Sequence, residues 1–261
     1  MTFDPDFALT SDLYESLGDV ALNSATYRRR VVIVLLDLST SMSFLTGPAD
    51  SRKPRIELLN EQLRQWLPEV RRQGAGSLRD VEFAVVSFSG RGVRLLTGPE
   101  SRPGPHAHED GGAFIAASDL DLGALEAFGT TPMVEAINLA LDLGAARVSY
   151  LAQERQLQTG QVRIVMFTDG SPFDRDLPED AWRAAAERIR TARNQRHIQF
   201  FSFGAPGADE TVLRAMSGDQ GYFPLTDFDF AKLLDLVLVA SSADDPFAAI
   251  REELGWEVPR T

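Results

Sequence analysis

Residues 31–41 read Val31-Val32-Ile33-Val34-Leu35-Leu36-Asp37-Leu38-Ser39-Thr40-Ser41. The first six of them form an unbroken aliphatic run, which is typical of a strand that is covered on both faces, as in a parallel sheet. The next five place one carboxylate and two hydroxyls at alternate positions directly after that strand. Because ligands of open α/β sheets bind outside the carboxyl ends of the strands, this junction is the first candidate for a binding site.

Strand-like and helix-like segments alternate downstream of this junction. Aliphatic and aromatic runs predict strands at 81–88, 162–167, 198–203 and 221–223, and a short antiparallel return at 93–96 after a Gly-rich turn. Apolar residues at helical spacing predict helices that include 56–70, 133–144, 182–189, 212–216 and 230–238. This alternation predicts a Rossmann-like, doubly wound α/β fold whose mostly parallel, six-stranded sheet has one antiparallel edge strand.

The pattern indicates one domain with two extensions. The chain has 261 residues, 44% of them hydrophobic, which is enough to bury one substantial core. Residues 30–242 carry the alternating pattern, interrupted by an irregular loop at 97–119. Residues 1–29 are apolar enough that we expect them to pack on the body or on another subunit. Residues 243–261 form a tail whose apolar side chains could pack back or dock a partner.

Composition excludes several classes of function. Lys and Arg number 26 against 38 Asp and Glu, and this net charge of -12 argues against nucleic acid and anionic lipid as partners. There is no cysteine, so the chain can form no disulfide and no thiolate metal site. The longest apolar runs are far shorter than the roughly 20 residues that span a bilayer. Residues 1–12 lack the basic and apolar pattern of a signal peptide, so we expect a cytoplasmic protein.

Oxygen-bearing side chains also occur in two later loops. Thr130 and Thr131 precede the helix predicted from residue 133, and Asp169 follows the strand at 162–167. Together with the Asp and Ser side chains of residues 37–41 they offer only oxygen ligands. Such a set suits a hard cation such as Mg²⁺, which takes about six oxygens.

These three segments resemble the metal ion-dependent adhesion site of von Willebrand factor A domains. Asp37-Leu38-Ser39-Thr40-Ser41 matches the family's D-x-S-x-S signature. Gly129-Thr130-Thr131-Pro132-Met133 and Phe167-Thr168-Asp169-Gly170 match, in order, the two loops that supply a Thr and an Asp. The resemblance covers roughly residues 30–240, and its overall pattern is nearest to bacterial intracellular members such as the TerY-like proteins of tellurite and stress-resistance clusters.

The resemblance implies a role for each of five residues. Ser39, Ser41 and Thr131 would offer hydroxyls to the metal, while Asp37 and Asp169 would act directly or through bound water. Thr131 is preferred to its neighbour Thr130 because the family's Thr directly precedes the helix start.

The resemblance also implies a partner. The ion would be Mg²⁺, with Mn²⁺ or Ca²⁺ as alternatives, and it would bind an Asp or Glu of another protein at an open coordination position. We therefore expect a metal-dependent protein-protein interaction module and not an enzyme. Such a module could serve as an adaptor in a stress-resistance complex or in one linked to an ATPase or kinase.

Other interpretations remain open on the sequence. A Mg²⁺-dependent hydrolase or phosphoryl-transfer enzyme could use Asp37 as its nucleophile, although Ser39 breaks the D-x-D pattern of dehalogenase-type phosphatases. The two serines could simply cap the next helix, and the Asp169-Gly170 pair could simply form a turn. A cluster in the irregular loop could bind a transition metal, although its Pro-rich and Gly-rich surroundings favour a solvated loop; it contains His106, His108, Glu109 and Asp110.

Overall fold

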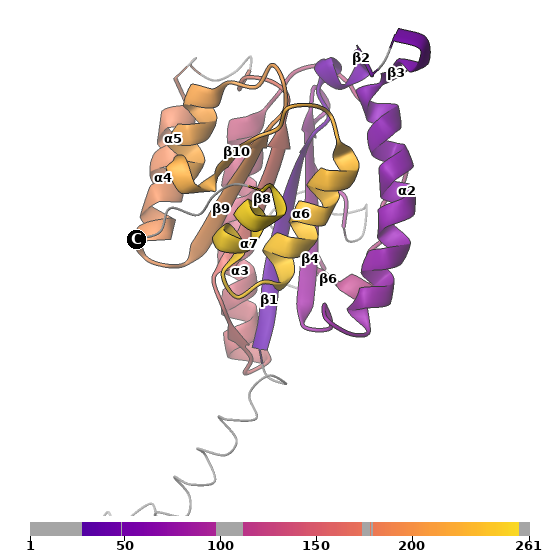
Figure 1. Ribbon diagram of the computed structural model, residues 1–261. Coiled ribbons are helices and arrows are strands. Elements are labelled where there is room, and N and C mark those ends of the chain that lie inside the picture. Colours follow the sequence, from indigo (N-terminus) through magenta and orange to yellow (C-terminus); the bar gives the residue numbers. More distant parts are fainter. Residues whose placement is uncertain (1–27, 48, 98–111, 174–177, 179, 256–261) are drawn as a thin grey trace, which may run out of the picture.

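A computed structural model describes residues 28–47, 49–97, 112–173, 178 and 180–255, which form a mostly parallel sheet with helices on both faces (Figure 1). The strand order is β10-β9-β8-β1-β4-β5, with short β6 on β4 and short β7 on β1. The strands of this sheet are β1 (Arg28–Asp37), β4 (Val81–Ser89), β5 (Gly92–Leu95), β6 (Ile115–Ala116), β7 (Gln158–Thr159), β8 (Val162–Thr168), β9 (Ile198–Gly204) and β10 (Tyr222–Pro224).

Strand β1 lies in the middle of the sheet, as its aliphatic run predicts. It pairs in parallel with β4 on one side and with β8 on the other, so Asp37 lies opposite Phe88 and Leu36 lies opposite Phe167. Strand β5 returns antiparallel to β4 at the edge. The predicted mostly parallel, six-stranded sheet with an antiparallel edge strand is confirmed, and the sheet is extended by the two-residue strands β6 and β7.

Helices α2, α6 and α7 cover one face of the sheet, and α3, α4 and α5 cover the other (Figure 1). Their bounds are α2 (Arg55–Gly74), α3 (Met133–Glu154), α4 (Trp182–Asn194), α5 (Glu210–Gly221), α6 (Phe230–Ser242) and α7 (Pro246–Glu253). Helices α5, α6 and α7 each begin after an Asp whose carboxylate accepts a backbone N–H of the first turn. Such caps satisfy donors that a helix start leaves without an internal partner.

The two faces of β1 feed two separate apolar cores. Val32, Val34 and Leu36 pack with the cluster under α2, α6 and α7. Their neighbours at 31, 33 and 35 pack with the cluster under α3, α4 and α5. All six side chains are buried, and each fully buried aliphatic side chain stabilises the fold by about 1.5–3 kcal/mol.

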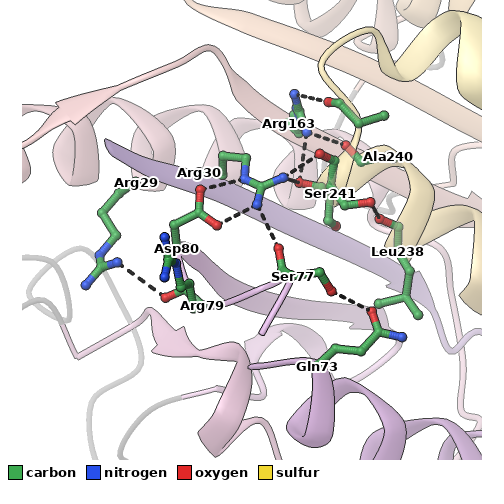
Figure 2. A network of polar contacts seen from close by, with 12 residues as sticks. Arg29, Arg30, Gln73, Ser77, Arg79, Asp80, Arg163, Leu238, Ala240 and Ser241 are labelled. Carbon is green, nitrogen blue, oxygen red and sulfur yellow. Dashed lines mark hydrogen bonds and ion pairs between the residues drawn. The ribbon is translucent and has the colours of Figure 1, made fainter. Parts of the chain in front are cut away.

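Two arginines at the amino ends of the strands hold the end of α6 (Figure 2). Arg163 of β8 donates to the backbone carbonyls of Ala240 at 2.8 Å, Ser241 at 2.9 Å and Ala243 at 2.7 Å. Arg30 of β1 also donates to the Ser241 carbonyl, and its Nε lies 2.8 Å from a carboxylate oxygen of Asp80. Positive charge at a helix C-terminus is favourable because the last carbonyls carry partial negative charge.

The predicted irregular loop and C-terminal tail both contain ordered elements. At the end of the loop, Ala113 is buried and β6 leads into the 3₁₀ helix η5 (Ala117–Asp119). In the tail, α7 buries Ile250, and the Phe247 ring lies 4.6 Å from that of Phe201. The predictions for residues 1–27, for the histidine cluster within 98–111 and for the part of the tail at 256–261 lie outside the described residues. No helix in the described part of the chain is both long and apolar enough to cross a bilayer.

Candidate metal centre

Three loops meet at the carboxyl ends of β1 and β8, beside the start of α3. The first loop follows β1, the second precedes α3 and the third follows β8. Backbone hydrogen bonds join them: Phe128 N to Leu38 O at 2.8 Å, Thr40 N to Gly129 O at 3.0 Å, Thr131 N to Phe173 O at 3.2 Å and Phe173 N to Thr131 O at 3.0 Å. The loops therefore form one connected rim.

A contact between two glycines fixes the second loop against the β4–β5 turn. A Cβ atom on Gly90 would lie only 2.5 Å from the Cα of Gly129, and Gly129 itself has a φ of 68°. Both the close approach and the left-handed backbone require glycine. The backbone that leads to Thr131 is held in place by this contact.

Asp37 organises the first loop. It ends β1 with an exposed fraction of 0%, and its two carboxylate oxygens accept hydrogen bonds from the Ser39 N–H at 2.9 Å and the Thr168 hydroxyl at 2.6 Å. The short 3₁₀ helix η2 (Thr40–Ser43) then turns the chain, so that the hydroxyl oxygens of Ser39 and Ser41 lie 3.0 Å apart. The alternating pattern of the sequence thus becomes a pair of adjacent hydroxyls beside a buried carboxylate.

The second and third loops bring the remaining predicted residues to the same place. The Ser41 hydroxyl donates to Asp169 Oδ1 at 2.5 Å, and the Asp169 side chain has an exposed fraction of 0%. A Cβ on Gly170 would lie 3.8 Å from Thr131 Oγ1 and 4.0 Å from Asp37 Oδ2. All five residues singled out from the sequence therefore lie in one cluster.

Burial raises the pKa of Asp37 from 3.8 to about 6. Hydrogen bonds from Ser39 and Thr168 lower this pKa, and the neighbouring Asp169 charge raises it, but desolvation dominates. A carboxylate in this position is short of compensating positive charge. The site is therefore electrostatically suited to a cation.

Two polar residues of the cluster were not singled out from the sequence. Arg55, the first residue of α2, donates from Nη1 to Asp169 Oδ2 at 2.5 Å and to the Ser41 carbonyl at 3.3 Å. Thr168 supplies the hydroxyl that binds Asp37. Its place beside Asp169 at a strand end was a usable signal, whereas the approach of Arg55 depends on how α2 packs and left no mark in the sequence.

The exposed large hydrophobic side chains of the described residues all lie on the three loops or directly next to them. Phe44 and Leu45 follow η2, Phe128 precedes Gly129, and Phe173 pairs with the Thr131 backbone. Their exposed fractions are 52–61%. We call these four side chains the apolar rim. Exposed apolar side chains gathered in one place mark interaction surfaces.

The donor set fits a hard divalent cation. Two ligands at right angles on Mg²⁺, each at about 2.0–2.1 Å, lie about 2.9 Å apart, which is close to the 3.0 Å between the hydroxyl oxygens of Ser39 and Ser41. The described residues contain no group of three or more His, Cys, Asp or Glu that could hold a metal. A metal here would therefore depend on the hydroxyls of Ser39, Ser41 and Thr131 as well as on the two carboxylates.

Comparison with known proteins yields matches to solved structures. No family model and no curated protein matches the chain. Proximal thread matrix protein 1 from the mussel byssus is 16% identical, with a TM-score of 0.47 over 80% of this chain, and this chain spans 47% of that protein. The SpRpn10 VWA domain is 13% identical, with a TM-score of 0.44 over 79% of this chain and 94% of that one. The TFIIH p34 N-terminal domain is also 13% identical, with a TM-score of 0.46 over 80% of this chain and 96% of that one. At these values the likenesses bear on neither the site nor the function.

Proposed function

We propose that this chain is a von Willebrand factor A-type module that binds a divalent metal ion and, through it, an acidic residue of a partner protein. The observation that carries the proposal is the convergence of five oxygen-bearing side chains from three loops at the carboxyl edge of the sheet. This edge is where α/β sheets bind their ligands.

Each residue of the cluster has a distinct task in this proposal. Ser39, Ser41 and Thr131 present hydroxyl oxygens to the ion. Asp37 orients the first loop by accepting the backbone N–H of Ser39. Asp169 accepts the proton of the Ser41 hydroxyl, so that a lone pair of that hydroxyl can face the metal. Bound Mg²⁺, or Mn²⁺ or Ca²⁺ in its place, would supply a Lewis-acidic position for a carboxylate oxygen from outside.

The surroundings of the site favour a protein as the ligand. The apolar rim offers surface that a partner could cover, as at the apolar centre of a protein interface. The net charge of -12 repels an acidic partner at long range, whereas a local dication reverses the sign within a few ångströms. Recognition of an acidic residue would thus depend strictly on the metal.

Binding, and not catalysis, is the role that the environment of Asp37 supports. A nucleophilic carboxylate needs an oxygen that can reach its substrate. Both oxygens of Asp37 accept hydrogen bonds, and the side chain has an exposed fraction of 0%. By the resemblance to intracellular family members, we further propose that the module acts in the cytoplasm as an adaptor of a stress-resistance complex or of one linked to an ATPase or kinase.

The proposal is tested with Asp37→Ala, with Asp142→Ala on the exposed surface of α3 as a matched control. Titration calorimetry should show Mg²⁺ binding to the wild type and the control, and a loss of at least about tenfold in affinity for Asp37→Ala. In affinity capture from the source cells, the same variant should lose the partners that EDTA removes from the wild type. Partners held at full strength in excess EDTA would contradict the proposal.

A further inference from the structure

Arg55 brings a positive charge into contact with the candidate metal centre. Its Nη1 lies 2.5 Å from Asp169 Oδ2, while the other oxygen of that carboxylate accepts the Ser41 hydroxyl at 2.5 Å. The Arg55 side chain is 16% exposed and that of Asp169 is 0% exposed. Both oxygens of Asp169 are therefore occupied within the protein, one of them by a cation.

The position of the Arg55 side chain is well defined. The residue begins α2, and its backbone N–H donates to the Phe44 carbonyl at 3.1 Å. Its guanidinium carbon lies 3.9 Å from the ring centroid of Phe228 and 5.7 Å from that of Phe44, within the range of cation–π attraction. Its Nε is buried and has no hydrogen-bond partner among the described residues. The polar contacts of the guanidinium are thus concentrated on Asp169 and on the Ser41 carbonyl.

A metal ion and Arg55 would compete for the same carboxylate. Asp37 and Asp169, when ionised, carry two negative charges, and Arg55 offsets one of them. A dication would turn the net charge of this group from -1 to +1, whereas without Arg55 it would turn it from -2 to zero. Like charges held a few ångströms apart in a partly buried site repel one another strongly. Binding of the dication is therefore more favourable when Arg55 is absent.

We propose that Arg55 is a resident counter-ion that competes with the metal for Asp169 and thereby sets a weak, concentration-dependent metal affinity. This inference rests on the proposed metal site and adds to it a residue that regulates its occupancy. Arg55 acts through Asp169, so it is a positioning residue. When the metal is absent, Arg55 also links the first loop to the third, because it contacts both Ser41 and Asp169.

The test measures Mg²⁺ affinity by titration calorimetry at pH 8 in the wild type and three variants. Arg55→Met keeps an unbranched side chain against Phe228 but removes the charge, and it should bind Mg²⁺ about tenfold more tightly. Arg55→Lys keeps the charge and should stay within about threefold of the wild type. Arg91→Met removes a positive charge from the β4–β5 turn, where Arg91 pairs with Glu126 and not with the cluster, and should leave the affinity unchanged.

Thermal unfolding gives a second readout. In EDTA, Arg55→Met should unfold at a lower temperature than the wild type, because the buried Asp169 carboxylate loses its counter-ion. Mg²⁺ should raise the unfolding midpoint of the variant more than it raises that of the wild type. Equal or weaker Mg²⁺ binding by Arg55→Met, with the wild type binding normally, overturns the inference and leaves the proposed function intact. Binding by the variant alone supports the inference and contradicts the function. Binding by neither overturns both.

Discussion

At Asp37, burial and charge act against each other. The native carboxyl has a pKa of about 6, raised chiefly by desolvation, whereas the unfolded chain has the ordinary value near 3.8. In EDTA the native state therefore holds a proton more tightly than the unfolded state. The stability that this difference contributes is fully present below pH ~4 and is lost as the pH rises through about 6.

We predict that Asp37→Asn, measured in EDTA, is more stable than the wild type at pH 7.5. The amide keeps an acceptor for the Ser39 N–H but has no charge to desolvate. A carboxyl whose pKa rises from 3.8 to about 6 on folding corresponds to a difference of roughly 3 kcal/mol at most. Urea unfolding from pH 4 to 8 should show the gap closing toward pH 4. A gap that stays constant across this range would rule out Asp37 as its source. Added Mg²⁺ should stabilise the wild type and not the variant.

At the scale of elements, the end of helix α6 depends on the buried cation Arg163 of strand β8. Burial first, and then the Arg30 charge, lower the pKa of Arg163 to about 10, and at ordinary pH the guanidinium stays charged. It donates to three carbonyls at the C-terminus of α6 and just beyond it (Figure 2). Without it, those carbonyls would remain in a largely buried position with fewer donors.

We predict that Arg163→Met lowers the free energy of unfolding by about 2–4 kcal/mol and selectively speeds amide hydrogen exchange in α6 and α7. Arg29→Met is the matched control. Arg29 is 36% exposed and lies 3.5 Å from Glu82, so its loss should cost less than about 1 kcal/mol. Equal losses of unfolding free energy in the two variants would show that the hydrogen bonds from Arg163 to α6 stabilise the fold no more than an exposed ion pair does.

The elements also show which features a sequence can predict. The long periodic segments were predicted correctly, but the observed elements extend beyond the predicted bounds. The helix expected at 212–216, for example, spans Glu210–Gly221. Two-residue strands such as β6 and β7 are too short to show a period, and each forms by pairing with a neighbouring longer strand, β6 with β4 and β7 with β1. Within the site, the five oxygen-bearing residues could be predicted, because they stand at strand ends or before a helix start and match the motifs of the resemblance. Arg55 and the apolar rim follow from how the loops and α2 pack together, which no local pattern encodes.

At the scale of the whole molecule, the net charge of -12 opposes the approach of the acidic partner that we propose. We predict that, in saturating Mg²⁺, the association rate rises severalfold between about 20 and 200 mM salt, because salt screens the long-range repulsion. Stopped-flow measurement with a captured partner tests this. The variant Asp142→Lys, changed at an exposed position of α3, should associate faster at low salt. A rate that falls as salt is added would indicate a basic contact surface instead.

Both faces of β1 are buried, and this limits how the protein can change over evolutionary time. Successive side chains of β1 point into different cores, so deleting or inserting one residue between 31 and 36 would either exchange the two sets of side chains or pull Asp37 out of line with Thr168. Length variation in this strand is thus excluded by packing. New binding properties at this edge would have to come from point substitutions in the loops or from changes in the rim.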